Sequence, residues 1–238
     1  MPVLLCAAAH AAGGCDPKDL DGPYGFLLSG TTTISGSPAA IASVGRLVFA
    51  AEGKLSGYSS VNFKGFFLGN PVTGSYEFHR DCTLTWSLQD DSGGLQQFAG
   101  TVTPGSGRVA FHQTDPGAGG RGVMARTFDT CKDVPWRGRF DFALAGASTP
   151  FAPDGARKSV SEKGVVEADG DGNLSLTQEN SKWDGSYELQ PDCFVMLYFE
   201  TETPIQLRGI LVNGGKEVLA IQTDPAQTGT ARLTARQP

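Results

Sequence analysis

Apolar residues recur at every second position along most of this chain. Tyr24, Phe26 and Leu28 share one face of the segment 22–31, and the segment 82–89 alternates in the same way. This period of two is typical of a β-strand with one buried face. Turn sequences such as AEGK, DDSGG and VNGGK separate the segments, and no long stretch follows the helical period. The pattern predicts an all-β protein.

The chain contains two copies of one pattern. The sequence GSYEFHRDC at 74–82 recurs as GSYELQPDC at 185–193, and GPYGFLLSG at 22–30 recurs as GRFDFALAG at 138–146. The letters QTDP also occur twice, as HQTDPG and IQTDPA, in the same order relative to the other matches. Ordered matches at a similar spacing indicate an internal duplication.

Each copy is long enough for one β domain of about eight short strands. Closing these strands into an up-and-down barrel would remove the sheet edges and leave a cup for one small ligand. We therefore expect two antiparallel eight-stranded β-barrels in one chain, with two β-sandwiches as the alternative. In the first copy the expected strands cover residues 22–31, 41–50, 54–64, 73–80, 82–89, 95–103, 108–115 and 120–127.

The expected organisation has three parts. Residues 1–14 are a signal-peptide remnant or a disordered tail, residues 15–128 the first barrel repeat, and residues 129–238 the second. The N-terminal stretch is apolar and contains Ala9-His10-Ala11, which has the A-x-A form of a signal-peptidase site, although the usual basic residues are missing. It is too short to span a bilayer, and we expect no transmembrane segment. The sequence thus predicts export to the periplasm or the extracellular space.

Four cysteines remain if the N-terminal stretch is removed. Cys15 and Cys131 each precede the first strand of a copy, and Cys82 and Cys193 each follow Asp in the same repeated motif. Four cysteines allow three pairings. The duplication favours Cys15–Cys82 and Cys131–Cys193, because a single ancestral copy could already have formed this bond, whereas crossed pairs need a swapped assembly. Disulfides imply an oxidising compartment, in agreement with export.

One set of motifs runs through the first copy and consists of Cys15, Leu20, Gly22, Tyr24, Phe26, Leu28, Gly30, Gly45, Leu47, Gly53, Leu55, Gly57, Tyr76, Asp81, Cys82 and Gln113 to Pro116. These motifs resemble a group of uncharacterised secreted bacterial proteins. The resemblance extends to the second copy, which departs from it at Trp136, Leu176 and Phe194. It implies no particular activity. The expected barrels are also similar to lipocalin and allene-oxide-cyclase architectures, and this analogy of fold does not fix a function.

Residues that both copies share are expected to serve the fold. Asp115 and Asp224 of the QTDP motif precede Pro at the end of a strand, where Asp accepts backbone N–H groups of the turn. Gln113 and Gln222 fall on the apolar face of their strands, so each amide needs hydrogen-bond partners within the fold.

Candidate catalytic residues lie where the copies differ. His79 and His112 belong to the first copy only, because the second has Gln and Ile in their places. Histidine titrates near neutral pH and serves as a general base, so either could act with Asp115 or Asp81 as the orienting carboxylate. Hydrolysis of a small ester or lactone, or a cyclase-like isomerisation, would follow. The alternatives are a surface histidine at position 79 and a packing histidine at position 112.

Binding of a small, mostly apolar molecule is the leading functional hypothesis. It rests on the expected cup and on aromatic residues that face inward, since ligand pockets are largely apolar. A surface or matrix interaction module is a further alternative and needs neither a cavity nor turnover. The expected ligand-binding residues are Tyr24, Phe26, Trp86, Phe140, Phe142 and Phe199.

Charge and motifs narrow the choice of partners and cofactors. The net charge is −6 and no basic run occurs, so the sequence has no electrostatic footprint for nucleic acid. It has no G-x-S-x-G, H-E-x-x-H or P-loop motif. The segment EADGDGNLSLTQ places Glu167, Asp169 and Asp171 as in a calcium loop, but Gln178 stands where the final Glu is needed. Calcium is therefore a minor hypothesis, and no other cofactor is expected.

Overall fold

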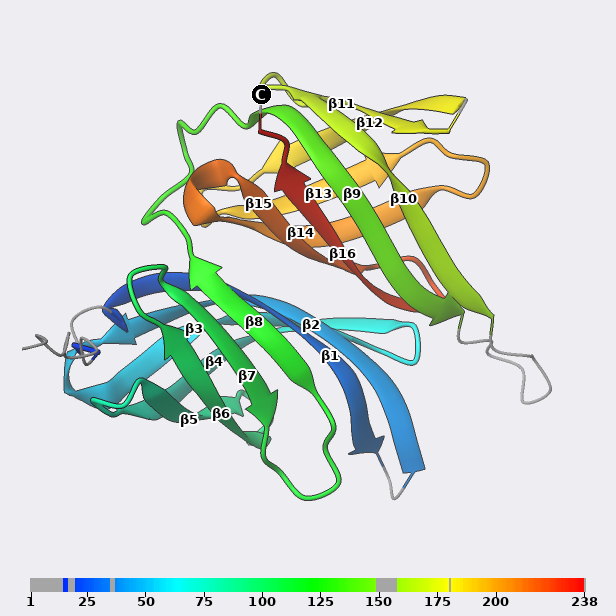
Figure 1. The fold of residues 1–238 in the computed structure, drawn as a ribbon. Helices are drawn as coiled ribbons and strands as arrows, with labels where there is room; N and C mark the ends of the chain where they lie inside the picture. The colour runs from blue at the N-terminus through cyan, green and yellow to red at the C-terminus, as the bar shows by residue number, and fades with distance from the viewer. Residues whose placement is uncertain (1–14, 17–19, 35–36, 149–157, 180, 238) are drawn as a thin grey trace, which may run out of the picture.

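The computed structural model describes residues 15–16, 20–34, 37–148, 158–179 and 181–237. These residues form sixteen β-strands in two closed barrels, which lie one above the other in Figure 1. The expected signal-peptide remnant, residues 1–14, lies outside the described residues.

Barrel 1 is built from the first eight strands and barrel 2 from the last eight. The strands of barrel 1 are β1 (Gly22–Ile34), β2 (Ser37–Ala50), β3 (Lys54–Phe63), β4 (Phe66–Phe78), β5 (Thr83–Asp90), β6 (Leu95–Thr103), β7 (Arg108–Gln113) and β8 (Arg121–Arg126). Those of barrel 2 are β9 (Arg137–Ser148), β10 (Ser159–Asp169), β11 (Asn173–Gln178), β12 (Ser181–Leu189), β13 (Phe194–Phe199), β14 (Ile205–Val212), β15 (Glu217–Gln222) and β16 (Gln227–Ala235).

Each barrel is an antiparallel meander that closes on itself. Neighbouring strands in the sequence pair with one another, and each circle closes where the first strand of a barrel pairs with the last, β1 with β8 and β9 with β16. The two-barrel prediction is confirmed. The β-sandwich alternative does not hold, because neither sheet has free edges at which it could end and stack on another.

The β3–β4 hairpin extends further than the sequence predicted. β4 begins at Phe66 instead of residue 73, and Phe66, Phe67 and Leu68 are exposed. No alternation of buried and exposed positions marks this stretch, so period-two analysis does not detect it. The hairpin tip reaches barrel 2, where the Asn62 side-chain amide donates to the backbone oxygens of Gln222 and Gln227, both at 2.7 Å.

Two disulfides tie the segment before each barrel to the start of its fifth strand. Cys15 is bonded to Cys82 and Cys131 to Cys193, with Cα–Cα distances of 5.2 and 5.0 Å. The pairing within each copy that the duplication favoured is confirmed. Since both bonds have equivalent positions, they are inherited parts of the repeated unit and not links between barrels.

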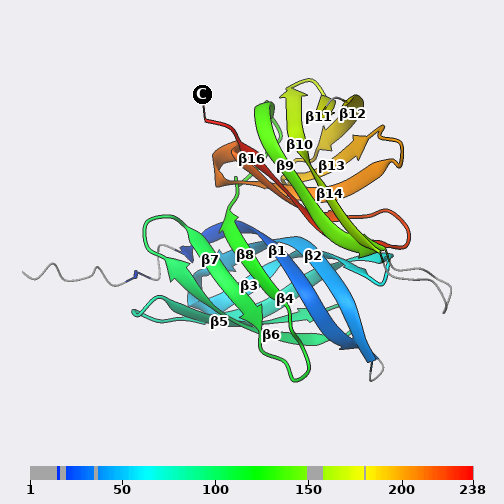
Figure 2. The ribbon, with the colours of Figure 1, turned by 45° about the vertical axis from the view of Figure 1, so that its right-hand side comes forward.

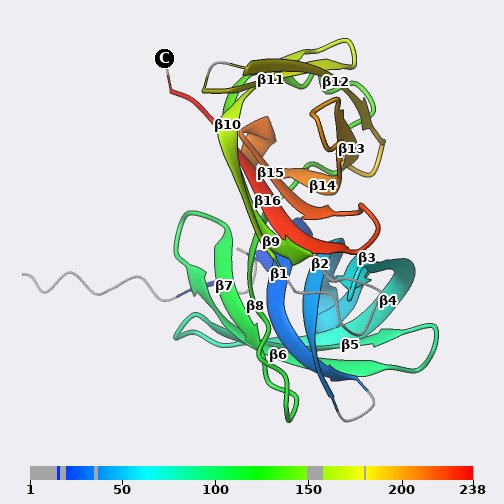
Figure 3. The ribbon, with the colours of Figure 1, turned by 90° about the vertical axis from the view of Figure 1, so that its right-hand side faces the viewer.

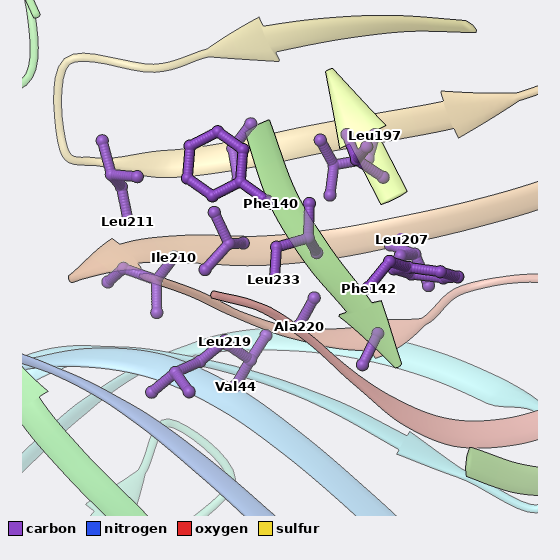
Figure 4. Close-up of a cluster of buried hydrophobic side chains, with 14 of the residues drawn as sticks. Val44, Phe140, Phe142, Leu197, Leu207, Ile210, Leu211, Leu219, Ala220 and Leu233 are labelled. Carbon is purple, nitrogen blue, oxygen red and sulfur yellow. The ribbon is translucent and has the colours of Figure 1, made fainter. Parts of the chain in front are cut away.

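Barrel 2 rests on the outer face of β1 and β2 through β14, β15 and β16 (Figure 2). Val44 of β2 lies beside Leu219 of β15 (Figure 4), and both belong to one apolar cluster that continues into the interior of barrel 2. Gly25 permits this approach, because a Cβ there would lie 2.5 Å from Val212 Cγ1. All six residues of β15 are buried, since one face packs inside the barrel and the other against barrel 1.

The two barrels meet through non-equivalent faces. β14, β15 and β16 are the counterparts of β6, β7 and β8, yet they contact β1 and β2. Such a heterologous contact could in principle repeat along a chain of barrels. At the equivalent positions, the free faces have residues that are polar or smaller. The apolar contacts Ile210, Leu219 and Ile221 of barrel 2 correspond to Thr101, Ala110 and His112 in barrel 1, and Gly25 and Val44 of barrel 1 correspond to Asp141 and Lys163 in barrel 2.

Candidate functional site

Barrel 2 has a hollow of about 720 Å³ at the end where β9 finishes and β10 begins. The strands of this barrel form a ring in Figure 3. The volume falls within the range of about 300–1,000 Å³ that is usual for ligand sites. We call this hollow the cup. Its lining residues are Leu144, Ser148, Lys158, Ser159, Val160, Glu162, Gln178, Trp183, Thr201, Glu202, Thr203, Pro204, Ile205, Gln222, Asp224, Pro225 and Gln227.

The same place in barrel 1 contains a cavity of only about 40 Å³. Three aromatic residues fill barrel 1 there: the Trp86 ring stacks on Phe98 at 5.1 Å between centroids and meets Phe111 at 5.2 Å. The counterparts in barrel 2 are Leu197, Leu207 and Ala220, which are smaller. These smaller side chains accompany the larger space in barrel 2, although none of the three lines the cup and Phe199 in place of Leu88 refills part of the interior.

A glycine in barrel 1 makes room for one ring of the aromatic plug. A Cβ on Gly122 would lie 2.3 Å from the Phe111 ring, so Phe111 requires glycine at this position. Barrel 2 has Ala231 there, paired with Ala220 across β15 and β16. The positions of Phe111 and Gly122 have therefore changed together between the copies, and barrel 2 has a small residue at both.

One wall of the cup is apolar. Leu144 and Ile205 are buried, and Val160 and Trp183 are half-buried. The side chains reach inward from β9, β14, β10 and β12, because inward positions alternate along each strand. A molecule in the cup would contact aliphatic and indole surface on this side.

Three carboxylates line the cup, and a glutamine amide contacts two of them, Glu162 and Asp224. Gln178 Nε2 donates to Glu162 Oε2 at 2.8 Å, and Gln222 Nε2 donates to Asp224 Oδ2 at 3.0 Å. Asp224 also accepts the backbone N–H of Gln206 at 3.1 Å. These contacts fix the direction of both carboxylates.

The cup contains a buried acceptor that has no partner. Gln222 is 4% exposed, and its Oε1 forms no hydrogen bond within the described part of the chain. Gln113 Oε1 of barrel 1 is in the same situation. Buried polar atoms usually have partners. Unlike Gln113, Gln222 lines a space large enough to admit a ligand, and so does Gln227, whose Oε1 also has no partner among the described residues.

The aromatic residues expected to bind a ligand lie deep in the barrels. Tyr24, Phe26 and Trp86 are buried in barrel 1, where Phe26 lines the small cavity. The expected residues of barrel 2, Phe140, Phe142 and Phe199, are also buried, and the rings of Phe142 and Phe199 lie 5.7 Å apart. None of the three barrel 2 residues lines the cup.

Neither candidate histidine lines the cup. His79 and His112 are exposed on barrel 1, and strands β5 and β6 lie between the end of β4, where His79 stands, and β7, which contains His112. The structure therefore does not bring them together or place either beside Trp183 or Glu162. The general-base hypothesis stays a prediction without a site that supports it.

The difference between His112 and Ile221 has a structural cause. Ile221 is fully buried against barrel 1, whereas His112 is exposed because it lies on a part of β7 that barrel 2 does not cover. The sequence left open a packing role for His112, and in the structure Ile221 has such a role but His112 does not. The polar residue is thus suited to the free face.

The carboxylates near the histidines make local turn contacts. Asp81 accepts the Thr83 hydroxyl at 2.7 Å and its N–H at 3.0 Å, and these hydrogen bonds hold the pKa of Asp81 below its usual range. Asp115 accepts the N–H of Gln97 at 3.0 Å, as Asp224 does with Gln206. The repeated QTDP motif thus fastens the end of β7 to β6 and the end of β15 to β14.

The proposed calcium loop is a β-hairpin turn. Asp169 accepts the N–H groups of Asp171 and Asn173, and the Asn173 side chain holds its pKa low. Glu167 instead pairs with Arg139 at 3.0 Å. Among the described residues, no group of three or more His, Cys, Asp or Glu side chains is arranged to hold a metal ion.

Sequence reasoning missed Glu162, Gln178 and Trp183. They occupy inward positions on three consecutive strands, where barrel 1 has Ser43, Ser59 and Val72. The signal that marks them is the difference between the two copies at these inward positions.

No family model matches the chain, and no curated protein sequence matches it. The resemblance of the motifs to secreted bacterial proteins thus stays a prediction. Within the described residues, no helix has the length and apolar character needed to cross a membrane.

Proposed function

We propose that this protein binds a small, mostly apolar molecule in the cup of barrel 2. The main support is the difference between the barrels: one copy has an aromatic plug and a cavity of about 40 Å³, and the other has a cup of about 720 Å³. Unfilled apolar space forfeits packing energy. A stable domain that retains such a space gains from a ligand that fills it.

The surroundings of the cup suit an apolar ligand. Leu144, Val160 and Ile205 offer aliphatic contacts, and Trp183 offers a large ring. The exposed residues Phe66 to Leu68 follow Gly65, whose Cβ would lie 2.6 Å from Ala226 in the loop that edges the cup. Apolar surface therefore continues outside the mouth.

Export is the proposed setting. Two disulfides close loops of 67 and 62 residues and are stable in an oxidising compartment. A carrier or sensor of apolar molecules in the periplasm or outside the cell would fit this chemistry.

Trp183 provides a direct test. Trp86 and Trp136 are 5% and 2% exposed in the barrel cores, so Trp183 is the indole beside the cup that a ligand would touch. Titration with decanol should shift the tryptophan emission to shorter wavelength in a saturable way. The Trp183→Phe variant should lose this shift and stay folded by circular dichroism.

The absence of any saturable shift in folded wild-type protein, up to the solubility limit of decanol, would contradict the proposal. An equal shift in the Trp183→Phe variant would place the binding elsewhere and would also contradict it.

A further inference from the structure

The charge of the cup differs from that of its counterpart in barrel 1. Glu162 on β10 faces the interior, where barrel 1 has Ser43. Three carboxylates, those of Glu162, Glu202 and Asp224, line the cup together with one cation, Lys158. No ion pair joins Glu162 or Asp224 to a cation within the described part of the chain.

An inward carboxylate in a barrel is costly unless a partner compensates for it. Glu162 is half-buried and receives a single side-chain hydrogen bond, from the neutral Gln178 amide. A carboxylate can accept several more. The arrangement leaves acceptor capacity directed into the space that a ligand would occupy.

Gln222 gives an independent indication of the same chemistry. Its Nε2 is engaged with Asp224, while its buried Oε1 lacks a donor within the described residues. A ligand with hydrogen-bond donors would satisfy this oxygen. A ligand with only acceptors would leave it unpaired, which costs free energy in a buried site.

Trp183 adds an aromatic face to this set. It stands on β12, next to the strand that contains Gln178. Indole is the side chain that attracts organic cations most strongly through its ring. In barrel 1 the equivalent residue is Val72.

We propose that the molecule bound in the cup carries an ammonium group on an apolar body, with Glu162 and Asp224 as the counter-charges. This inference rests on the proposed function, because it assumes that the cup binds a ligand. The apolar wall would contact the body of the ligand. Glu162 and Asp224, which glutamine amides hold in place, would bind its ammonium group.

Three probes with the same alkyl chain separate the charge from the apolar contact. Decylammonium, decanol and decanoate are titrated into the full-length protein at neutral pH, with Trp183 emission as the signal. We expect decylammonium to bind about tenfold more tightly than decanol, and decanoate to bind most weakly. The preference should shrink as salt is added, because partly exposed charges are screened.

Glu162→Gln is the decisive variant, and Glu188→Gln, on the exposed outer face of β12, is its control with the same change in net charge. Glu162→Gln should weaken the binding of decylammonium about tenfold and change the affinity for decanol by no more than about twofold. Glu188→Gln should change neither. If Glu162→Gln does not fold, the salt dependence of the wild-type preference remains as the test.

The outcomes distinguish the two proposals. If decanol binds but decylammonium has no advantage, or if Glu162→Gln retains the full advantage, the cationic ligand is excluded and the apolar cup stands. If none of the three probes binds to folded protein, the proposed function fails and this inference fails with it.

Discussion

Arg108 and Glu217 occupy the same position in the two repeats and bind each other. They are 109 residues apart in the sequence, and the Arg108 guanidinium makes two hydrogen bonds to the Glu217 carboxylate, at 2.8 and 3.0 Å. The Glu217 side chain is 5% exposed and that of Arg108 35%. Both bonds hold the pKa of Arg108 above its usual value, despite burial. One position of the ancestral strand has thus become a complementary pair.

Removal of either partner should destabilise the protein, and removal of Arg108 should cost more than removal of the Glu217 charge. Arg108→Met leaves the buried Glu217 carboxylate with only the more distant Arg232, at 3.9 Å, and should cost about 2 kcal/mol of unfolding free energy. Glu217→Gln leaves the cation on the more exposed side chain and should cost about half as much. Urea denaturation of both variants measures this order, and a larger loss in Glu217→Gln would refute it.

The heterologous interface predicts opposite effects at equivalent positions. Ile221→His buries a polar ring against barrel 1 and should cost about 2–3 kcal/mol. His112→Ile, at an exposed site, should change stability by no more than about 0.5 kcal/mol.

Self-association provides a second readout for this interface. The triple variant Thr101→Ile/Ala110→Leu/His112→Ile recreates on barrel 1 the apolar face of barrel 2, and exposed apolar patches promote association. Light scattering should detect oligomers that grow with concentration. A monodisperse triple variant would show that the polar residues of the free face do not limit assembly.

Tyr187 should make stability sensitive to alkaline pH. Its hydroxyl donates to the backbone oxygen of Trp136 at 2.9 Å, and burial raises its pKa above the ordinary value of 10.0. Because the folded pKa is the higher one, the neutral phenol stabilises the fold fully below the unfolded pKa, and this contribution is lost as pH rises through the folded pKa.

Tyr187→Phe should therefore cost about 1 kcal/mol at neutral pH through the lost hydrogen bond. It should also flatten the decline of stability between neutral pH and about pH 11. Denaturation curves across this range test both effects, with the more exposed Tyr198→Phe as control. A wild-type decline that persists unchanged in Tyr187→Phe would argue against this role.

The disulfide of barrel 2 should contribute strongly to stability. The Cys131–Cys193 bond closes a loop of 62 residues, and the chain-entropy model assigns about 4 kcal/mol to such a bond. The variant Cys131→Ser/Cys193→Ser should lose about this amount in guanidinium denaturation. Cys15→Ser/Cys82→Ser should lose a similar amount, since its loop has 67 residues. A midpoint unchanged by either replacement would contradict the estimate.

The fold followed from local features of the sequence. Period-two alternation and turn residues are set by neighbours in the chain, so β6 was predicted with its observed limits, Leu95–Thr103. The duplication then fixed the number of barrels and the disulfides. The early start of β4 at Phe66 escaped detection because its first residues are exposed and show no alternation of buried and exposed positions, while the hairpin contacts barrel 2 through Asn62.

The cup could not be predicted from any single segment of the sequence. The larger space accompanies the replacement of Trp86, Phe98 and Phe111, on three strands, by smaller residues in barrel 2. Each replacement is conservative in hydrophobicity, so the patterns stay the same while the enclosed volume changes. His112 was singled out in the sequence because histidine is chemically distinct from the Ile221 of the second copy. The difference between the two residues follows from how barrel 2 packs on barrel 1, and the sequence does not show this arrangement.

Calorimetric titration with the apolar probe N-phenyl-1-naphthylamine tests most directly whether barrel 2 alone holds a ligand. Val160 faces the cup and Ser161, its neighbour on β10, faces outward, so Val160→Trp fills the cup and Ser161→Trp is the matched control. We predict one bound probe per chain in the wild type and in Ser161→Trp, and none in Val160→Trp. Unchanged binding to Val160→Trp, or two probes per chain in the wild type, would contradict the account.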